Sequence, residues 1–205
     1  MSAEGPPPGG RVPPGVGAPR EGDQPIPTWI DGALVPYPKL AAHLEGRRHM
    51  AVSVFVLRGA DGAAETLIQR RAAGKYHTPG LWANSCCTHP AWTADGPEDD
   101  AACAARRLGE ELGIEGLAMR PAGEVEYRAD VGGGLVEHEV VRLFTAEAPE
   151  GLRIAPDPAE VQDIRWISLH SLRHDVIDRP ARYTPWLRLY LTEHAGRIFG
   201  FDPAT

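Results

Sequence analysis

The chain has few cysteines and no long apolar run. Its 205 residues include three cysteines, and two of these, Cys86 and Cys87, are adjacent. An odd number with an adjacent pair is a poor framework for disulfide bonds, so we expect a reducing, cytoplasmic location. No segment reaches the roughly 18 consecutive apolar residues that a membrane span requires, and we therefore expect no membrane partner.

The sequence also lacks an excess of positive charge. Its formal net charge is −7 at pH 7, with a pI near 5.6. This balance argues against nucleic acid or an anionic membrane as the main partner, although it is compatible with a local basic pocket. No internal repeat is visible, and nothing in the sequence specifies an oligomeric state.

Composition divides the chain into a tail and one globular domain. Residues 1–27 are rich in proline and glycine and lack the apolar segment of a signal peptide, so we expect a disordered tail. The remainder is long enough to bury one hydrophobic core. We set the folded domain at residues 28–201 and a short C-terminal tail at residues 202–205.

Hydrophobic periodicity predicts a mixed α/β arrangement. Apolar and β-branched patterns predict a hairpin over 28–38 with its turn at Asp31-Gly32, a loop or helical turn over 40–49, and strands over 50–58, 65–71, 123–129, 135–148 and 163–168. A turn at Asp61-Gly62 separates the strands expected over 50–58 and 65–71. An amphipathic helix is expected over 184–199. Strands alternating with helices favour an α+β or three-layer fold with a mixed sheet.

The stretch from Lys75 to Gly113 concentrates reactive side chains. Cys87 and His89 are two residues apart, so in an extended segment they lie on one face, while Cys86 lies on the other. A thiol and an imidazole are therefore placed together by local sequence.

A helix is expected over residues 96–112 of this stretch. Pro97 suits its first position and Gly113 its end, and acidic residues at 98–100 suit the positive end of the helix dipole. The expected apolar stripe consists of Ala102, Ala105, Leu108 and Leu112. Arg107 and Glu111 are four apart and share a polar face.

Histidines and glutamates form a possible metal-binding set: His43, His49, His89, Glu137 and Glu139. In a strand, Glu137 and Glu139 face one side and His138 the other. Two neighbouring carboxylates repel each other unless a cation lies between them. From the residues alone, surface histidines and a solvated strand face are the simpler interpretation.

The segment from Glu98 through Arg106, Glu110 and Glu111 to Gly113 resembles a degenerate Nudix box. It departs from the hydrolase pattern at Trp92, in place of a glycine, and at Arg107, in place of a glutamate. With GLWANSCCTHP just upstream, these features resemble the type I isopentenyl-diphosphate isomerases over residues 29–200. The resemblance implies an α/β/α sandwich that interconverts isopentenyl and dimethylallyl diphosphates in isoprenoid precursor biosynthesis.

The resemblance also implies two metal sites. The His/Glu set above would hold one Mn²⁺, Mg²⁺ or Zn²⁺, and Glu111 would bind Mg²⁺ that bridges the diphosphate oxygens. The spacing between His43 and His49 is one residue shorter than in the family members that align best.

Roles in catalysis are implied in the same way. Moving a double bond requires an acid and a base on opposite sides of the substrate. The resemblance assigns Cys87 and Glu139 as that pair, with Glu139 as donor helped by Tyr127, and Trp186 as the aromatic face over the pocket. Arg71, Lys75 and Arg107 would grip the diphosphate. Without the resemblance, Cys87 is a buried small side chain, Trp186 is a helix anchor, and the basic residues are surface charges.

Two other functions are compatible with these motifs. A Nudix hydrolase would release phosphate, but Arg107 stands where that activity needs a glutamate. A non-catalytic module would bind diphosphate tightly without turnover, and its binding would be unchanged by Cys87→Ala.

Overall fold

The computed structural model describes residues 24–59 and 63–200. Most of the expected N-terminal tail, the expected C-terminal tail and the turn at Asp61-Gly62 lie outside these residues. The first strand begins at Pro25, ahead of the boundary that we set at residue 28. Within the described ranges, no helix is both long and apolar enough to cross a membrane.

An N-terminal hairpin leads into the first helix. Strands β1 (Pro25–Ile30) and β2 (Ala33–Pro38) pair antiparallel. Asp31 and Gly32 connect them with φ angles of 51° and 81°, as expected for a tight two-residue hairpin turn. Helix α1 (Lys39–Glu45) follows directly, which confirms a helical turn in this region.

The main sheet is mixed and centred on β3. Besides β1 and β2, this sheet contains β3 (Arg48–Arg58), β4 (Glu65–Arg71), β5 (Trp82–Ala83), β6 (Cys86–Thr88), β9 (Arg120–Gly132), β10 (Leu135–Glu147) and β11 (Val161–Ser168). Strand β10 runs parallel to β3, whereas β4 and β6 pair with β3 antiparallel. The β3–β10 register places His49 opposite Glu139. A separate small ribbon joins β7 (Trp92–Thr93) and β8 (Gly96–Pro97).

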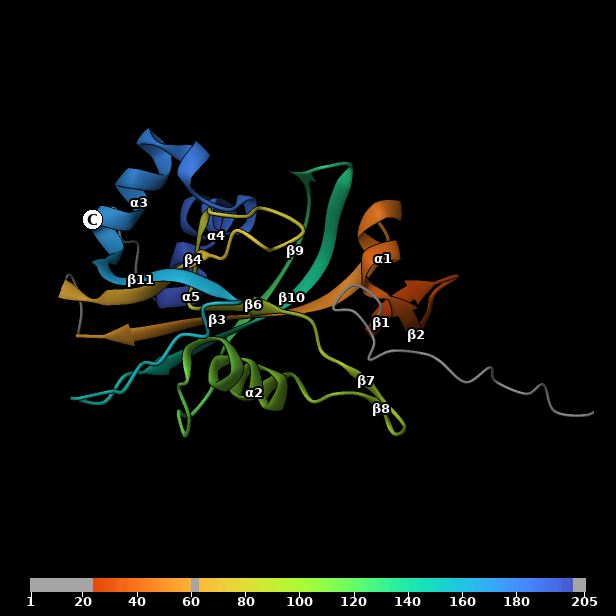
Figure 1. The fold of residues 1–205 in the computed structure, drawn as a ribbon, viewed down its shortest axis with the longest axis horizontal. Helices are drawn as coiled ribbons and strands as arrows, with labels where there is room; N and C mark the ends of the chain where they lie inside the picture. The colour runs from red at the N-terminus through yellow and green to blue at the C-terminus, as the bar shows by residue number, and fades with distance from the viewer. Residues whose placement is uncertain (1–23, 60–62, 201–205) are drawn as a thin grey trace, which may run out of the picture.

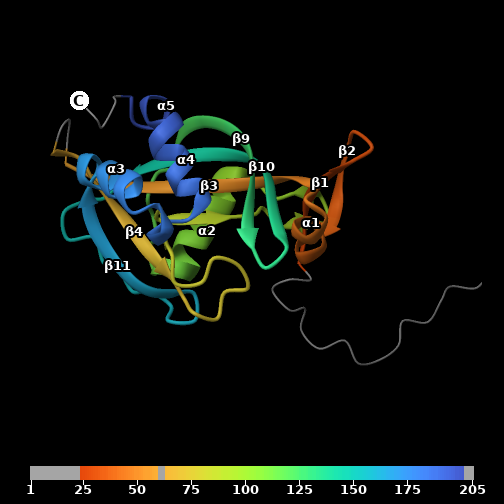
Figure 2. The same ribbon diagram turned by 90° about the horizontal axis from the view of Figure 1, so that it is seen from above.

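Helices cover both faces of this sheet. Figure 1 shows α2 (Asp100–Leu112) on one side and α3 (Leu169–Asp178), α4 (Pro185–Glu193) and α5 (Ala195–Phe199) on the other. Figure 2 shows the same elements from above. Alternate residues of β3 enter two cores: Val54 packs on the α2 side and Phe55 on the α4 side. The predicted α/β/α sandwich with a mixed sheet is confirmed.

Helix α2 begins later than the sequence predicts. Pro97 lies in β8, and the side chain of Asp99 caps the helix by accepting a hydrogen bond from the Ala102 backbone N–H at 2.9 Å. The predicted stripe is half wrong, because Ala102 and Ala105 are exposed. The side chains buried on this helix are Cys103, Ala104, Leu108, Glu111 and Leu112. Because Glu111 is buried, the inward face of α2 differs from the predicted stripe. The partners of Glu111 are evident only in the folded structure.

The C-terminal region contains more helices than expected. The single helix expected over 184–199 is divided at His194 into α4 and α5. Helix α3 was not predicted, although Ser168 caps it by accepting from the Ser171 backbone N–H at 3.1 Å. Its buried Leu169, Leu172 and Val176 have helical spacing, which is the signal that would have identified it.

Candidate active site

A polar pocket lies at the end of the sheet where β3, β10 and the segment after β6 converge. It is lined by Lys39, Arg71, Lys75, His77, Cys87, Thr88, His89, Arg107, Glu111, Glu137, Glu139 and Trp186. Most of the side chains that the sequence singled out are therefore gathered in one place. His43, His49 and Tyr127 do not line the pocket, but each contacts a residue that does.

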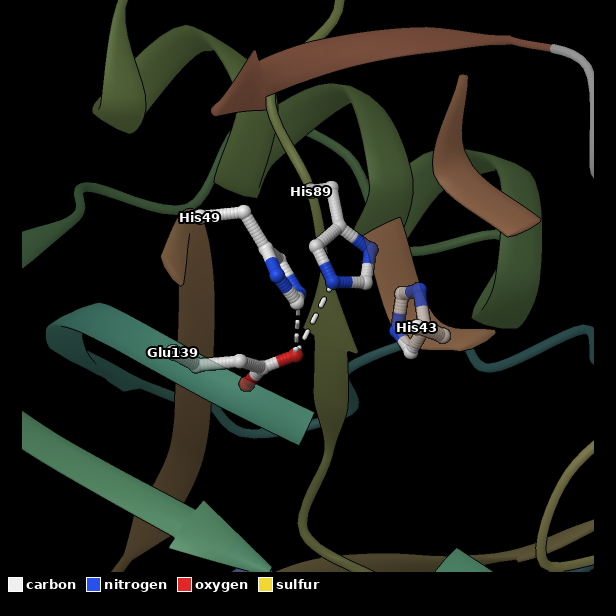
Figure 3. A group of neighbouring side chains, drawn as sticks. All are labelled: His43, His49, His89 and Glu139. Atoms are coloured by element: carbon white, nitrogen blue, oxygen red, sulfur yellow. Dashed lines mark hydrogen bonds and ion pairs between the residues drawn. The ribbon is translucent and has the colours of Figure 1, made fainter. Parts of the chain in front are cut away.

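Three histidines converge on Glu139 from different elements (Figure 3). His43 comes from α1, His49 from β3, His89 from the segment after β6, and Glu139 from β10. The potential ligand atoms of these four residues lie within 4.8 Å of one another. Glu139 Oε1 is 2.9 Å from His89 Nε2 and 3.5 Å from His49 Nε2.

The chemistry of this cluster fits a divalent cation. The Nδ1–H groups of His43 and His49 donate to the backbone carbonyls of Lys39 and Arg47, each at 2.7 Å, because a carbonyl can only accept. In the neutral rings the Nε2 lone pairs then face the cluster, and both Nε2 atoms are buried without a hydrogen-bond partner. Burial, with His49 nearby, lowers the pKa of His43 to about 4, which keeps it neutral. Neutral imidazoles beside a carboxylate form a common ligand set for such metals.

Glu137 lies beside this cluster and contacts different partners. Its Oε1 is 3.1 Å from His77 Nε2, and its Oε2 is 2.8 Å from the Tyr127 hydroxyl oxygen. Glu137, His77 and His43 form a second potential ligand group. His138 points the other way, toward the surface residue Glu126, so the predicted alternation along β10 is confirmed.

Tyr127 joins the two buried carboxyls. Its hydroxyl is 2.8 Å from Glu137 Oε2 and 2.7 Å from Glu139 Oε2. One hydroxyl hydrogen satisfies only one of these contacts, so the other calls for a proton on a carboxyl group. Burial and the charge of Glu139 raise the pKa of Glu137 well above its usual range. Burial also favours neutral Glu139, but the hydrogen bond from His89 outweighs it and holds the pKa of Glu139 well below its usual range.

Cys87 faces the pocket, whereas Cys86 faces away from it. Cys86 packs in the core beneath α2 together with Cys103, and Cys87 packs with the opposite core, as the two-residue period predicts. Burial, followed by the charges of Glu139 and Glu137, raises the pKa of the Cys87 thiol well above its ordinary value. Cys87 therefore keeps its proton in the resting protein.

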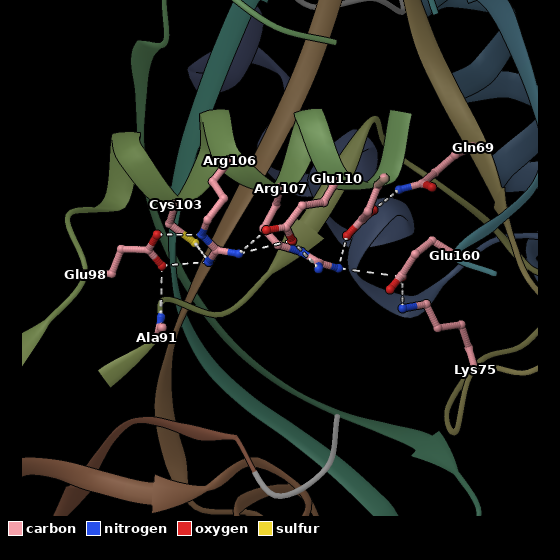
Figure 4. A network of polar contacts seen from close by, with 10 residues as sticks. Gln69, Lys75, Ala91, Glu98, Cys103, Arg106, Arg107, Glu110 and Glu160 are labelled. Carbon is pink, nitrogen blue, oxygen red and sulfur yellow. Dashed lines mark hydrogen bonds and ion pairs between the residues drawn. The ribbon is translucent and has the colours of Figure 1, made fainter. Parts of the chain in front are cut away.

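Two of the predicted cations, Lys75 and Arg107, belong to a network of ion pairs beside α2 (Figure 4). Arg107 donates to Glu111 Oε1 at 2.6 Å and to Glu110 Oε2 at 2.8 Å. Lys75 forms an ion pair with Glu160, whose carboxylate is also 3.6 Å from Arg107 Nη2. Acidic partners thus balance these cations before any anionic ligand enters.

Comparison with known proteins identifies the family. A NUDIX domain model matches residues 47–187. A Dinoroseobacter shibae protein named isopentenyl-diphosphate Delta-isomerase is 62% identical over 175 residues, which are 85% of this chain and 95% of that protein. The chain belongs to the isopentenyl-diphosphate Delta-isomerase family of NUDIX proteins. A Cereibacter sphaeroides protein of the same name is 60% identical over 85% of this chain and 94% of its own length.

A solved structure supports the fold of this family member. The crystal structure of a Deinococcus radiodurans protein aligns with a TM-score of 0.55 and 15% identity, and it covers 76% of this chain and 90% of that chain. At this identity the comparison concerns the fold alone. The NUDIX domain and the His/Glu cluster together indicate a divalent metal site in this isomerase-family chain.

Trp186 is both a core residue and a wall of the family member's pocket. It is 1% exposed, and its Nε1–H donates to Asn84 Oδ1 at 3.2 Å. The Arg71 guanidinium lies 5.4 Å from the centre of its ring. The two interpretations of Trp186 given by the sequence are therefore compatible with each other.

Several residues of the site were not identified from the sequence. Lys39 and His77 line the pocket, Gln69 donates to Glu111 Oε2 at 2.7 Å, and Glu160 pairs with Lys75. Lys39 stands one helical turn before His43, a spacing that would have placed it near the site. Glu160 precedes a strand far along the chain, and nothing local indicates its position.

Proposed function

We propose that this protein catalyses the interconversion of isopentenyl diphosphate and dimethylallyl diphosphate through Cys87 and Glu139, in isoprenoid precursor biosynthesis. The activity agrees with the names of its relatives. One structural observation carries the proposal: a thiol and a buried carboxyl share a pocket with four cationic side chains. A hydrolase needs no such thiol, whereas a double-bond shift needs two positioned proton carriers.

The diphosphate end of the substrate is bound by Arg71, Lys75 and Arg107. A diphosphate oxygen accepts strong hydrogen bonds from these cations, and the partly buried setting strengthens the interaction. Binding releases Lys75 and Arg107 from part of their contact with Glu160. The hydrocarbon end then lies toward Cys87, Glu139 and Trp186, which line the same pocket.

Protons are carried by Cys87 on one side of the hydrocarbon and by Glu139 on the other. One group adds a proton at a terminal carbon, and the other removes a proton two carbons away. Because the reaction is reversible, the donor in one direction is the acceptor in the other. The acceptor gains one proton for each proton that the donor loses, and exchange with water in the empty pocket restores both groups between turnovers. Tyr127 and Glu137 hold a further proton beside Glu139.

The pocket also protects the positive charge that develops on the substrate. Protonation of the alkene leaves this charge at a tertiary carbon, where an aromatic face stabilises it by roughly 0.5–2 kcal/mol. Trp186 lines the pocket and would supply such a face. Exclusion of water prevents capture of the cation.

The His/Glu cluster would hold one Zn²⁺, Mn²⁺ or Mg²⁺ through His43, His49, His89 and Glu139, with Glu137 beside them. When bound, the cation supplies positive charge that orients Glu139 and offsets the repulsion between the two carboxyls. Glu111 would bind a Mg²⁺ that accompanies the diphosphate. In the free protein Glu111 is buried and held by Gln69 and Arg107.

Hydrolysis is disfavoured by the contacts of Arg107. Its guanidinium donates hydrogen bonds to Glu110 and Glu111, two carboxylates on the Nudix-like helix α2. A hydrolase would instead carry a further carboxylate at position 107 to hold catalytic metal. The substitution supports binding of diphosphate over its cleavage.

The test is incubation of the purified protein with isopentenyl diphosphate, Mg²⁺ and a trace of Mn²⁺ or Zn²⁺ in D₂O, followed by NMR. We expect deuterium bound to carbon in both substrate and dimethylallyl diphosphate, with no phosphate released. Phosphate release without deuterium would instead assign a hydrolase. Absence of both signals, with tight diphosphate binding, would assign a binding module.

Arg107→Ala is expected to weaken substrate binding more than it slows turnover. Loss of a charge-assisted contact to phosphate raises KM by roughly tenfold or more. Steady-state kinetics measure this change, with Arg120→Ala as a control because Arg120 pairs with Glu147 on the surface. A large fall in kcat at unchanged KM would contradict the binding role.

Glu160→Gln is expected to strengthen binding of inorganic pyrophosphate. The Glu160 carboxylate forms an ion pair with Lys75 and lies 3.6 Å from Arg107. The neutral amide of the variant loses this attraction, so both cations are more available to an anion. An increase in affinity of roughly severalfold is expected for loss of one partly exposed ion pair. Titration calorimetry measures it, with the exposed Glu147→Gln as control. Weaker binding would show that Glu160 holds the cations in place.

A further inference from the structure

His77 is buried in the pocket, and the proposed reaction does not use it. It lies between Arg71, which binds diphosphate, and Glu137, which holds a proton with Tyr127. We propose that His77 is a positioning residue that donates to Glu137 and thereby links the diphosphate grip to the proton-holding carboxyls. The inference deepens the proposed function and rests on it.

The hydrogen bonds of His77 define its tautomer. Arg71 Nη2 lies 3.2 Å from His77 Nδ1, and a guanidinium can only donate. Nδ1 therefore accepts, and the single hydrogen of the neutral ring is on Nε2. This Nε2–H donates to Glu137 Oε1 at 3.1 Å.

The same tautomer removes His77 from the metal ligands. His43, His77 and Glu137 lie close enough to form a three-ligand group. His77, however, directs its one lone pair at Arg71 and presents a hydrogen toward Glu137. His43 has one Nε2 lone pair to offer, and that atom also belongs to the cluster around Glu139. The geometry thus points to one ion, with His77 outside its ligand set.

Glu137 depends on His77 for its orientation. Its two oxygens have separate partners: Oε1 accepts from His77, and Oε2 lies 2.8 Å from the Tyr127 hydroxyl. Together these two contacts fix the plane of the carboxyl group. Arg71 depends on the ring less, because its Nη2 also donates to the His77 backbone carbonyl at 3.1 Å. Loss of the ring should therefore disturb proton transfer more than diphosphate binding.

Three substitutions separate the two contacts of the ring. In His77→Gln the amide nitrogen replaces Nε2 and still donates to Glu137. In His77→Asn the carbonyl oxygen replaces Nδ1 and accepts from Arg71, but the shorter side chain does not reach Glu137. His77→Ala removes both contacts.

We expect His77→Asn and His77→Ala to lose kcat by about tenfold or more, as for the loss of one partner of a buried hydrogen bond. His77→Gln should retain most of the rate, and KM should change little in all three variants. His138→Ala is the matched control, since His138 lies on β10 next to Glu137 but points to the surface. Equal loss of kcat in the Gln and Ala variants would overturn the proposal.

Two further measurements do not depend on turnover. Elemental analysis should find the same metal content in wild type and in all three variants. Long-range ¹⁵N–¹H NMR, with His77 assigned from its absence in His77→Gln, should show the Nε2–H tautomer. Loss of metal in the variants, or an Nδ1–H tautomer, would overturn the positioning role even in an active enzyme. An inactive wild type with the expected tautomer and metal content would contradict the proposed function instead.

Discussion

Glu139→Gln is expected to reduce the conversion of isopentenyl diphosphate by roughly a hundredfold to ten-thousandfold, the range for loss of a positioned acid or base. Glu139 lines the pocket, contacts His89 at 2.9 Å and is joined to Tyr127 at 2.7 Å. A glutamine amide keeps the size of the side chain but cannot take up or release a proton at neutral pH. The measurement is kcat by NMR.

The metal site shares Glu139, so the assay needs a measure of metal content and a matched control. Glu126→Gln is suitable because Glu126 lies on β9 next to Tyr127 but pairs with Arg48 at the surface. We expect this control to retain wild-type turnover. Near-normal activity of Glu139→Gln would remove Glu139 from the acid–base pair. Loss of both metal and activity, with activity restored at saturating metal, would assign Glu139 to metal binding alone.

Cys87→Ala is expected to reduce turnover by a similar factor while the protein stays folded. The thiol faces the pocket, and burial raises its pKa, so it carries a proton in the resting protein. Alanine carries none. The substitution removes one buried atom, which makes the loss of stability small compared with the loss of rate.

The chain provides a matched control for this variant in the neighbouring residue. Cys86 is fully buried, whereas Cys87 is partly buried, and Cys86 packs beneath α2 on the opposite face of β6. Cys86→Ala should therefore lower the melting temperature slightly and leave kcat unchanged. If both alanine variants lose activity equally, the effect is structural. If Cys87→Ala remains active, proton transfer on that side belongs to another group.

Local sequence determined the features that depend on short-range periodicity. The two-residue period of a strand placed Glu137 and Glu139 inward and His138 outward, and it separated Cys87 from Cys86. The hairpin turn at Asp31-Gly32 followed from residue types in the same way.

Helical spacing was a weaker guide. It paired Arg107 with Glu111, but the alanine stripe on α2 was wrong. Small side chains carry little information about which face is buried, because alanine is tolerated inside and outside. The buried face was set instead by Cys103 and by Glu111, which has Gln69 and Arg107 as partners.

Tertiary structure decided which of these side chains meet. His49 and Glu139 are far apart in sequence and become neighbours because β3 and β10 pair in parallel with that register. Such pairing is a non-local contact, and no short segment encodes it. The resemblance to a known family indicated which histidines and glutamates to consider, whereas the positions of His77 and Glu160 came from the fold alone. A loop residue and a residue before a distant strand carry no periodic signal, so only the packed chain shows what they contact.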